Sequence, residues 1–335
     1  MKKRASPLSA SSPSSVVFSR GRLWLGLQLI IWLSVLACSL ALIRIAARSP
    51  SLDAAVGEET PLSGGTPKIA FLFLSRSHLP LDFVWHAFFQ NAEEEKYSIY
   101  VHSEPGFVFD RTTTRSPFFF GRQIPDSIKV IWGESTMIEA ERLLLAAALK
   151  DPANQRFAFI SDSCVPLYNF SYIYNYVISS PKSFVDSFLD KKEGRYSPKM
   201  FPTIPRDRWR KGSQRLSGGA LGGKQKNMSQ LDDELERRTL TYTSWNQSID
   251  AKDKRSWHPK TFEFADASPQ HITEIKGINH VYYETEYRTE WCQCNATFVP
   301  CFLFARKFSR GAAMRILNDG LVGPFDAGSL FFPDS

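Results

Sequence analysis

Polar side chains that follow apolar, strand-like runs are the first candidates for a site that does chemistry. His102 and Glu104 lie at the end of one such run, and Asp162 lies at the end of another. In an α/β protein the parallel strands end at one edge of the sheet, and ligands bind beyond that edge. The sequence therefore predicts that these three residues share one ligand-binding edge.

The chain lacks the carboxylate pair that would hold a metal ion against a diphosphate. Nucleotide-sugar transferases that use a metal usually present two aspartates separated by one residue, and this pattern is absent from the sequence. The nearest approach, Asp232 with Glu234, is more typical of a solvated helix face. The sequence also has no zinc-type His/Cys cluster and no Gly-rich phosphate loop after its first strand. We expect neither a metal nor a cofactor.

Without a metal, a leaving diphosphate has to be neutralised by side-chain cations. Arg288 and Lys307 are the candidates, one close to Cys292 and the other two residues after the apolar run 302–305. For Arg288, a surface ion pair within the acidic segment 284–288 is the alternative.

The elements that must position these residues alternate between strand and helix patterns. Thr136 with Glu139 has the spacing of a capping box. We predict strands over 69–74, 97–102, 128–132 and 156–160, and helices over 81–91 and 137–149. This alternation is typical of an α/β fold with a mostly parallel sheet and flanking helices.

The second half of the chain is less regular. We predict strands over 184–188 and 240–245, and a buried segment over 301–308 that enters a short helix. The Gly-rich, basic stretch 215–227 has no period and is interpreted as a surface loop.

The N-terminal region has the pattern of a membrane anchor. Residues 23–43 form 21 uncharged positions, which is enough to span a bilayer. A cleaved signal peptide is the rival interpretation, but its apolar region is usually shorter. Five cations precede the span and two follow it, which predicts a cytosolic tail over 1–22, a flexible stem over 44–66 and a luminal domain over 67–335.

Charge does not indicate nucleic-acid binding. The net charge is +7, and seven cations lie in the N-terminal region before the first acid, so the rest of the chain is neutral. A phosphate-binding footprint would need the surplus on the folded part.

Four of the five cysteines fall on the predicted luminal side, where disulfides are permitted. Cys301 is expected to close a small loop with Cys292 or Cys294, and we carry the Cys292–Cys301 pairing forward as the prediction. The chain has four sequons for N-glycosylation, which fit the same topology: Asn169, Asn227, Asn246 and Asn295.

Several long strings resemble a known family. They are the segments 161–170 (SDSCVPLYNF), 209–214 (WRKGSQ), 257–259 (WHP), 283–288 (YETEYR) and 301–308 (CFLFARKF). They are similar to the plant, brittle-culm branch of the core-2/I-branching β-1,6-N-acetylglucosaminyltransferase family. The likeness covers nearly all of residues 68–326.

This resemblance implies a Golgi type II membrane glycosyltransferase with a GT-A-type fold, inverting and independent of metal. It implies transfer of a GlcNAc-like sugar from a UDP-sugar to a glycan or cell-wall acceptor. Arg288 and Lys307 match the basic pair that faces the UDP diphosphate, and Ser75 and His102 lie where base and ribose would bind. The resemblance places the acceptor contacts at Asp186, Arg195, Tyr196 and Trp245.

One departure from the family pattern affects catalysis. Arg215 follows Gln214 directly, and on the order of fifty family residues, including the glutamate that acts as general base, are absent at this point. Glu234 lies near the gap but aligns better with a later element. An inactive pseudoenzyme or a splice product is therefore the alternative function, and a receptor-like ectodomain without a nucleotide site is a third.

Overall fold

The structure is a computed structural model, and it describes residues 28, 32–34, 36, 65–131, 134–189, 210–211, 215–218, 234–245, 258–294 and 297–322. The chain divides into two units, Met1–Pro61 and Leu62–Ser335. In the first unit the few described residues are helical. Within the described ranges, no helix has the length and apolar character needed to cross a bilayer. Most of the predicted span 23–43, and all of the predicted tail 1–22, lies outside those ranges.

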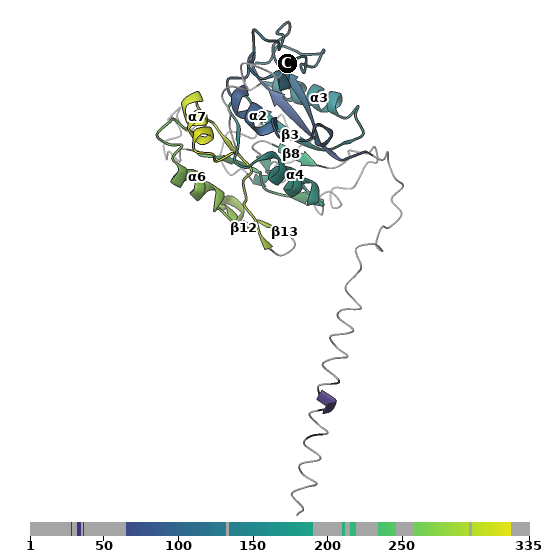
Figure 1. The fold of residues 1–335 in the computed structure, drawn as a ribbon, viewed down its shortest axis with the longest axis vertical. Coiled ribbons are helices and arrows are strands. Elements are labelled where there is room, and N and C mark those ends of the chain that lie inside the picture. The colour runs from purple at the N-terminus through teal and green to yellow at the C-terminus, as the bar shows by residue number, and fades with distance from the viewer. Residues whose placement is uncertain are drawn as a thin grey trace, which may run out of the picture. The chain divides into compact units, whose positions relative to one another are not determined.

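The centre of the second unit is a six-stranded sheet with the strand order β2-β1-β3-β8-β5-β9 (Figure 1). Strands β1 (Lys68–Leu74), β2 (Tyr97–His102) and β3 (Asn154–Ser161) run parallel to one another. The predicted strands 69–74, 97–102 and 156–160 are therefore confirmed. Five consecutive residues of β1 are fully buried, which is typical of a strand covered by helices on both faces.

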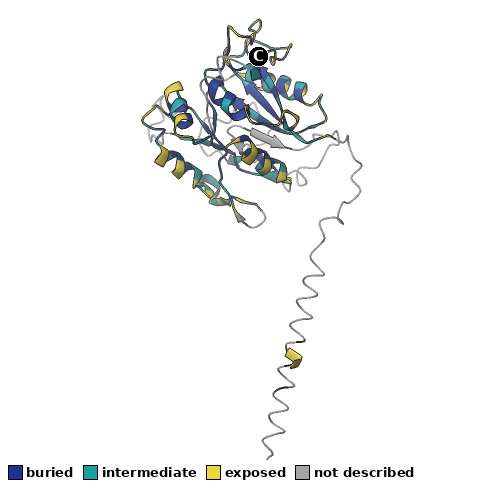
Figure 2. Ribbon diagram, in the orientation of Figure 1, coloured by how far each residue is buried: buried dark blue, intermediate teal, exposed yellow. Residues whose placement is uncertain are grey.

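Helices cover both faces of this sheet. Alternate residues of β1 pack into two hydrophobic clusters on opposite faces. The larger cluster includes α2 (Asp82–Phe89) and α4 (Phe170–Ser179), and the smaller one includes α3 (Ser135–Ala148). The burial colouring shows the central strands and the inner helix faces in dark blue (Figure 2). The predicted α/β class and the two helices are confirmed.

The far side of the sheet is mixed rather than parallel. Strand β8 (Arg215–Gly218) lies between β3 and β5 (Ser183–Val185) and is antiparallel to both. Strand β9 (Leu235–Glu236) then pairs parallel with β5. The prediction of a surface loop over 215–227 is wrong for its first four residues, because they complete the hydrogen bonding of two neighbouring strands. Residues 219–227 lie outside the described ranges.

Residues 128–131 are not a strand, so this part of the prediction 128–132 is also wrong, and residue 132 lies outside the described ranges. The backbone N–H of Ile128 donates to His102 Nε2 at 3.1 Å, and that of Ile131 donates to Thr136 Oγ1 at 3.0 Å. These side-chain acceptors replace a strand neighbour. Helix α3 starts with Glu134 at the N-cap and without a side-chain cap, so Thr136 is not the predicted capping residue.

The remaining elements extend the second half of the chain. Strands β10 (Thr241–Thr243), β15 (Phe304–Arg306) and β4 (Val165–Pro166) form a three-stranded sheet. The paired strands are β11 (His280–Tyr283) with β12 (Arg288–Trp291), β13 (Gln293–Cys294) with β14 (Thr297–Phe298), and β6 (Phe188–Leu189) with β7 (Arg210–Lys211). Two later helices are α6 (Pro269–Lys276) and α7 (Arg310–Asn318). The predicted buried segment 301–308 followed by a short helix is confirmed.

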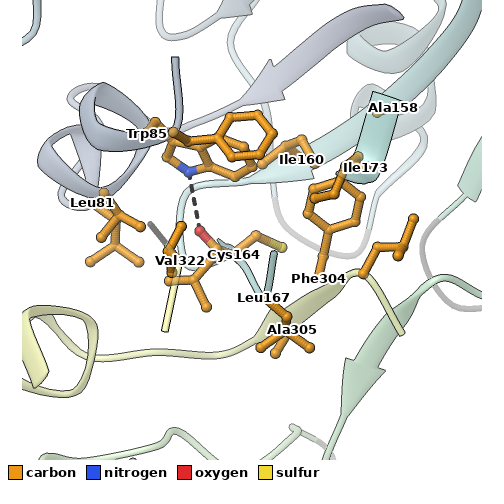
Figure 3. Packing of buried hydrophobic residues seen from close by; sticks show 14 of the residues in the cluster. Leu81, Trp85, Ala158, Ile160, Cys164, Leu167, Ile173, Phe304, Ala305 and Val322 are labelled. Carbon is orange, nitrogen blue, oxygen red and sulfur yellow. Dashed lines mark hydrogen bonds between the residues drawn. The ribbon is translucent and has the colours of Figure 1, made fainter. Parts of the chain in front are cut away.

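One aromatic side chain joins the main sheet to the second sheet. Trp85 of α2 is 1% exposed, and its Nε1–H donates to the carbonyl oxygen of Cys164 at 3.2 Å. Its ring packs against Phe73 of β1 and Phe304 of β15. Figure 3 shows the indole between these layers, with the hydrogen bond to Cys164 as a dashed line.

A disulfide joins Cys292 to Cys301, nine residues apart, and both cysteines are fully buried. Replacing both by serine is expected to lower the free energy of unfolding by roughly 2–3 kcal/mol, because the short loop gains freedom in the unfolded chain. Denaturant unfolding of the variant and of the parent tests this. Reducing the parent protein should cause the same loss, and an unchanged midpoint in both experiments would contradict it.

Candidate functional site

The carboxyl ends of three parallel strands meet at one edge of the sheet. Leu74 of β1 is in register with His102 of β2 and with Ser161 of β3. Ser75 and Asp162 follow directly after β1 and β3. The structure therefore brings Ser75, His102 and Asp162 to the same edge, as parallel topology requires. Glu104, the third predicted residue, is exposed, and its backbone N–H donates to the Arg76 carbonyl at 2.9 Å.

Ser75 and His102 are both buried, and a hydrogen bond joins their backbones. The N–H of Ser75 donates to the His102 carbonyl at 3.0 Å, and its hydroxyl donates to the Ser77 carbonyl at 3.0 Å. His102 Nε2 accepts the Ile128 N–H, so the ring proton lies on Nδ1. Burial lowers the pKa of His102 and keeps the ring neutral. Its Nδ1 is buried and has no partner within the described ranges.

Three cationic side chains form what we call the strand-end cation cluster: Arg76, Arg306 and Lys307. Arg76 comes two residues after β1, and the other two lie at the end of β15. Desolvation lowers the pKa of Lys307, the charges of Arg306 and Arg76 lower it further, and Asp162 opposes the change. Arg306 Nε is buried without a hydrogen-bond partner in the described part of the chain. A site with these properties favours an incoming anion.

Backbone hydrogen bonds fix the position of Lys307. The N–H of Phe308 donates to the Ser163 carbonyl at 3.0 Å, and the Lys307 carbonyl accepts the N–H of Phe262 at 2.7 Å. The first bond ties the end of β15 to the turn after β3. Lys307 is thereby held beside Asp162 although more than a hundred residues separate them in the sequence.

The structure places the second predicted cation, Arg288, in a different environment. Its Nε pairs with Glu286 at 2.9 Å and its Nη1 pairs with Glu290. The guanidinium also lies 4.2 Å from the ring centroid of Tyr283. Glu286 also pairs with Arg237 at 2.8 Å, so two carboxylates balance the charges of two arginines here. Within the described ranges, the hydrogen-bond and ion-pair partners of Arg288 do not include Lys307, which leaves the predicted basic pair without a shared contact in this structure.

The predicted acceptor residues are only partly described. Asp186 is buried and accepts a hydrogen bond from the hydroxyl of Tyr283 at 3.0 Å. Burial, with the Asp186 carboxylate as a further cause, raises the pKa of Tyr283 and keeps its hydroxyl protonated. Trp245 is 43% exposed and offers part of its ring to solvent. Arg195 and Tyr196 lie outside the described residues.

One predicted glycosylation position is described. Asn169 is exposed at the N-cap of α4, where its side-chain oxygen accepts the Tyr172 N–H at 2.9 Å. This contact uses the oxygen and leaves the amide nitrogen, the atom that carries an N-linked glycan, unused by the cap. Asn227, Asn246 and Asn295 lie outside the described ranges.

Sequence reasoning missed Arg76 and Arg306 as members of the site. The available signals were an arginine directly after the predicted strand-end Ser75, and the adjacent pair Arg306-Lys307 at the end of an apolar run. Arg76 and Arg306 are far from each other in sequence, so only the fold shows that the charges of both act on Lys307.

A mixed α/β sheet with cations beyond the carboxyl ends of its parallel strands defines a class of proteins that bind nucleotides or other phosphorylated ligands. Residues 69–217 match the model of the family described as Core-2/I-Branching enzyme. The chain is also 44% identical over 325 residues to Glycosyltransferase BC10 of Oryza sativa subsp. japonica, an alignment that covers 82% of each protein. The chain belongs to the Core-2/I-branching family of glycosyltransferases, which confirms the resemblance found in the sequence.

Proposed function

We propose that this chain transfers a GlcNAc-like sugar from a UDP-sugar to a glycan or cell-wall acceptor, with inversion and without a metal ion. The observation that carries the proposal is the strand-end cation cluster: a backbone hydrogen bond from Phe308 to Ser163 ties Arg306 and Lys307 to the turn after β3, and Arg76 follows β1 at the same edge. Family membership supports a nucleotide-sugar donor and a glycan acceptor. A Golgi location and a type II membrane anchor over 23–43 belong to the same proposal and are supported by the sequence pattern.

The cluster supplies what a metal ion would otherwise provide. As the bond between sugar and diphosphate breaks, negative charge accumulates on the leaving diphosphate, and fixed cations stabilise it most where water is scarce. Lys307 is half-buried and is repelled by Arg306 and Arg76. A bound diphosphate relieves this repulsion, which favours both UDP binding and departure of the leaving group.

In this proposal Ser75 and His102 lie where the nucleoside of the donor binds. His102 presents a buried Nδ1–H without a partner, which suits a carbonyl or hydroxyl oxygen of the ligand after a small rearrangement. Ser75 holds the loop that carries Arg76 through its hydrogen bonds to His102 and Ser77.

The alternative function is a protein that binds UDP-sugar without transferring it. An inverting transfer needs a general base for the acceptor hydroxyl, and losing such a base typically costs about 10²- to 10⁴-fold in rate. The alignment with the rice protein spans 325 positions, but it includes only 82% of the 335 residues of this chain, so some aligned positions have no residue here. This difference supports the proposal that a family segment following Gln214, with its base, is absent here.

Binding and transfer measurements separate the two functions. UDP at about 100 times its dissociation constant is expected to stabilise the full-length protein by about 2.7 kcal/mol, with or without a chelator. Transfer of the sugar from the UDP-sugar to a glycan acceptor is then measured with and without the chelator. Binding without transfer would favour the inactive alternative, whereas loss of binding or transfer on adding chelator would contradict the metal-free mechanism.

A further inference from the structure

A pocket of about 610 Å³ is lined by none of the residues of the strand-end cation cluster or of the proposed donor site. Its walls come from the segment after β1, which includes His78 and Pro80, from residues 111–120 after β2, and from Arg310 at the start of α7. The volume falls within the usual range for small-molecule sites, roughly 300–1,000 Å³, and accommodates one or more sugar rings.

The charge of the pocket favours an anion. Three arginines line it, Arg111, Arg115 and Arg310, against one carboxylate, Asp82. That carboxylate is already engaged, since its Oδ2 accepts the Thr114 hydroxyl at 2.8 Å and the Arg115 N–H at 2.9 Å. Cations therefore outnumber acids on the wall that a ligand would meet.

Arg310 is held in place without losing its capacity to bind. Its guanidinium lies 4.8 Å from the ring centroid of Phe83, and its Nη1 lies 3.5 Å from the carbonyl oxygen of Pro80. Neither contact is an ion pair. A guanidinium that is oriented by a ring and a carbonyl keeps several N–H donors for a carboxylate.

The uncharged part of the lining suits a sugar ring. Thr112 and Thr113 donate their hydroxyl hydrogens to Asp110 and to the Val108 carbonyl, both at 2.6 Å. The Thr113 oxygen also accepts the Asp110 N–H at 2.9 Å and keeps one lone pair, so the Thr112 oxygen is the better acceptor for a sugar hydroxyl. Pro117 and Phe120 add apolar surface for the C–H face of a ring.

The pocket and the donor site share two chain segments. The segment after β1 provides Arg76 to the cation cluster and His78 to the pocket, and Arg310 follows Lys307 by three residues. From this juxtaposition we propose that the pocket binds a carboxylate-bearing sugar of the acceptor glycan, such as a uronic acid. This inference rests on the proposed function and names the chemical class of its acceptor.

Binding of a uronic-acid oligosaccharide to the full-length protein tests the proposal. A galacturonic-acid hexamer is compared by titration calorimetry with the same hexamer after methyl esterification, which removes the negative charge of each carboxylate and adds one methyl group. We expect the acidic hexamer to bind about tenfold more tightly or better, with a difference that shrinks as salt is raised. Equal binding of the two hexamers, or binding of neither, would overturn the proposal.

Variants then assign the effect to the pocket. Arg111→Gln combined with Arg310→Gln should weaken binding of the acidic hexamer roughly tenfold and leave the esterified hexamer unchanged. Arg142→Gln is the matched control, because that exposed residue of α3 has the same charge and pairs with Glu139 at 3.7 Å. An equal loss in the control would overturn the assignment. The stabilisation by UDP is measured on every variant, so that failure of the donor site is distinguished from failure of the pocket.

Discussion

Replacing Lys307 by glutamine is expected to lower the rate of sugar transfer by roughly 10²- to 10³-fold, the effect typical of losing one group that stabilises transition-state charge. Lys307 is held between the turn after β3 and Phe262, and its ammonium group is already partly desolvated. Glutamine keeps most of the side-chain volume but removes the charge. The same variant should lose most of the stabilisation by UDP, which a thermal-shift titration measures.

Lys96→Gln is the control for the charge change. Lys96 precedes β2 and so lies at the opposite edge of the sheet, where it pairs with Glu93 at 2.6 Å. Its replacement should leave both UDP binding and transfer within about twofold of the parent, because surface ion pairs contribute little. Similar losses in the two lysine variants would contradict a specific role for Lys307.

The pH dependence of UDP affinity gives an independent test of this residue. Burial and the charge of Arg306 lower the pKa of Lys307 below the ordinary lysine value of 10.5, whereas a bound diphosphate raises it again. Affinity should therefore fall as pH rises through the lowered pKa, because the free protein loses the proton that the complex retains. In the Lys307→Gln protein this fall should be absent.

The first half of the fold was predictable because local pattern and tertiary structure agree there. The apolar run 69–74 is buried on both faces, and the predicted strand and helix boundaries around it differ from the structure by a few residues only. The prediction failed for 215–218 because pairing with strands distant in sequence determines the structure of this segment. The 215–218 segment has Gly and Ser and no period, yet it forms β8 because β3 and β5 present open hydrogen-bonding edges to it.

The site was predictable at the strand ends and less so among the cations. Topology alone brings Ser75, His102 and Asp162 to one edge. Strand prediction was sufficient to find His102 and Asp162, whereas Ser75 came from the family resemblance. The ion pairing of Arg288 includes Glu290, two residues away on the same strand, which the sequence interpretation did not include. The contribution of Arg306 requires β15 to run beside the turn after β3, which a sequence pattern does not encode.

Replacing Trp85 by alanine is expected to lower the free energy of unfolding by roughly 3–5 kcal/mol, the usual loss for a large aromatic removed from a core. The indole packs edge-on against Phe73 at a centroid distance of 5.0 Å and stacks with Phe304 at 6.2 Å. Its removal leaves a cavity between the main sheet and β15, and leaves the Cys164 carbonyl without its donor (Figure 3). Such a loss is a large part of the roughly 5–15 kcal/mol that stabilises a typical protein.

Trp291→Ala removes the same side chain from an exposed position and serves as the matched control. Trp291 is 53% exposed on β12, where it contacts His280 and Phe298. Its replacement should cost about 1 kcal/mol or less, since little apolar surface returns to water. Denaturant unfolding of both variants gives the comparison. Equal losses would show that the buried Trp85 contributes no more to stability than an exposed tryptophan. Other interactions would then position β15 and Lys307 at its end.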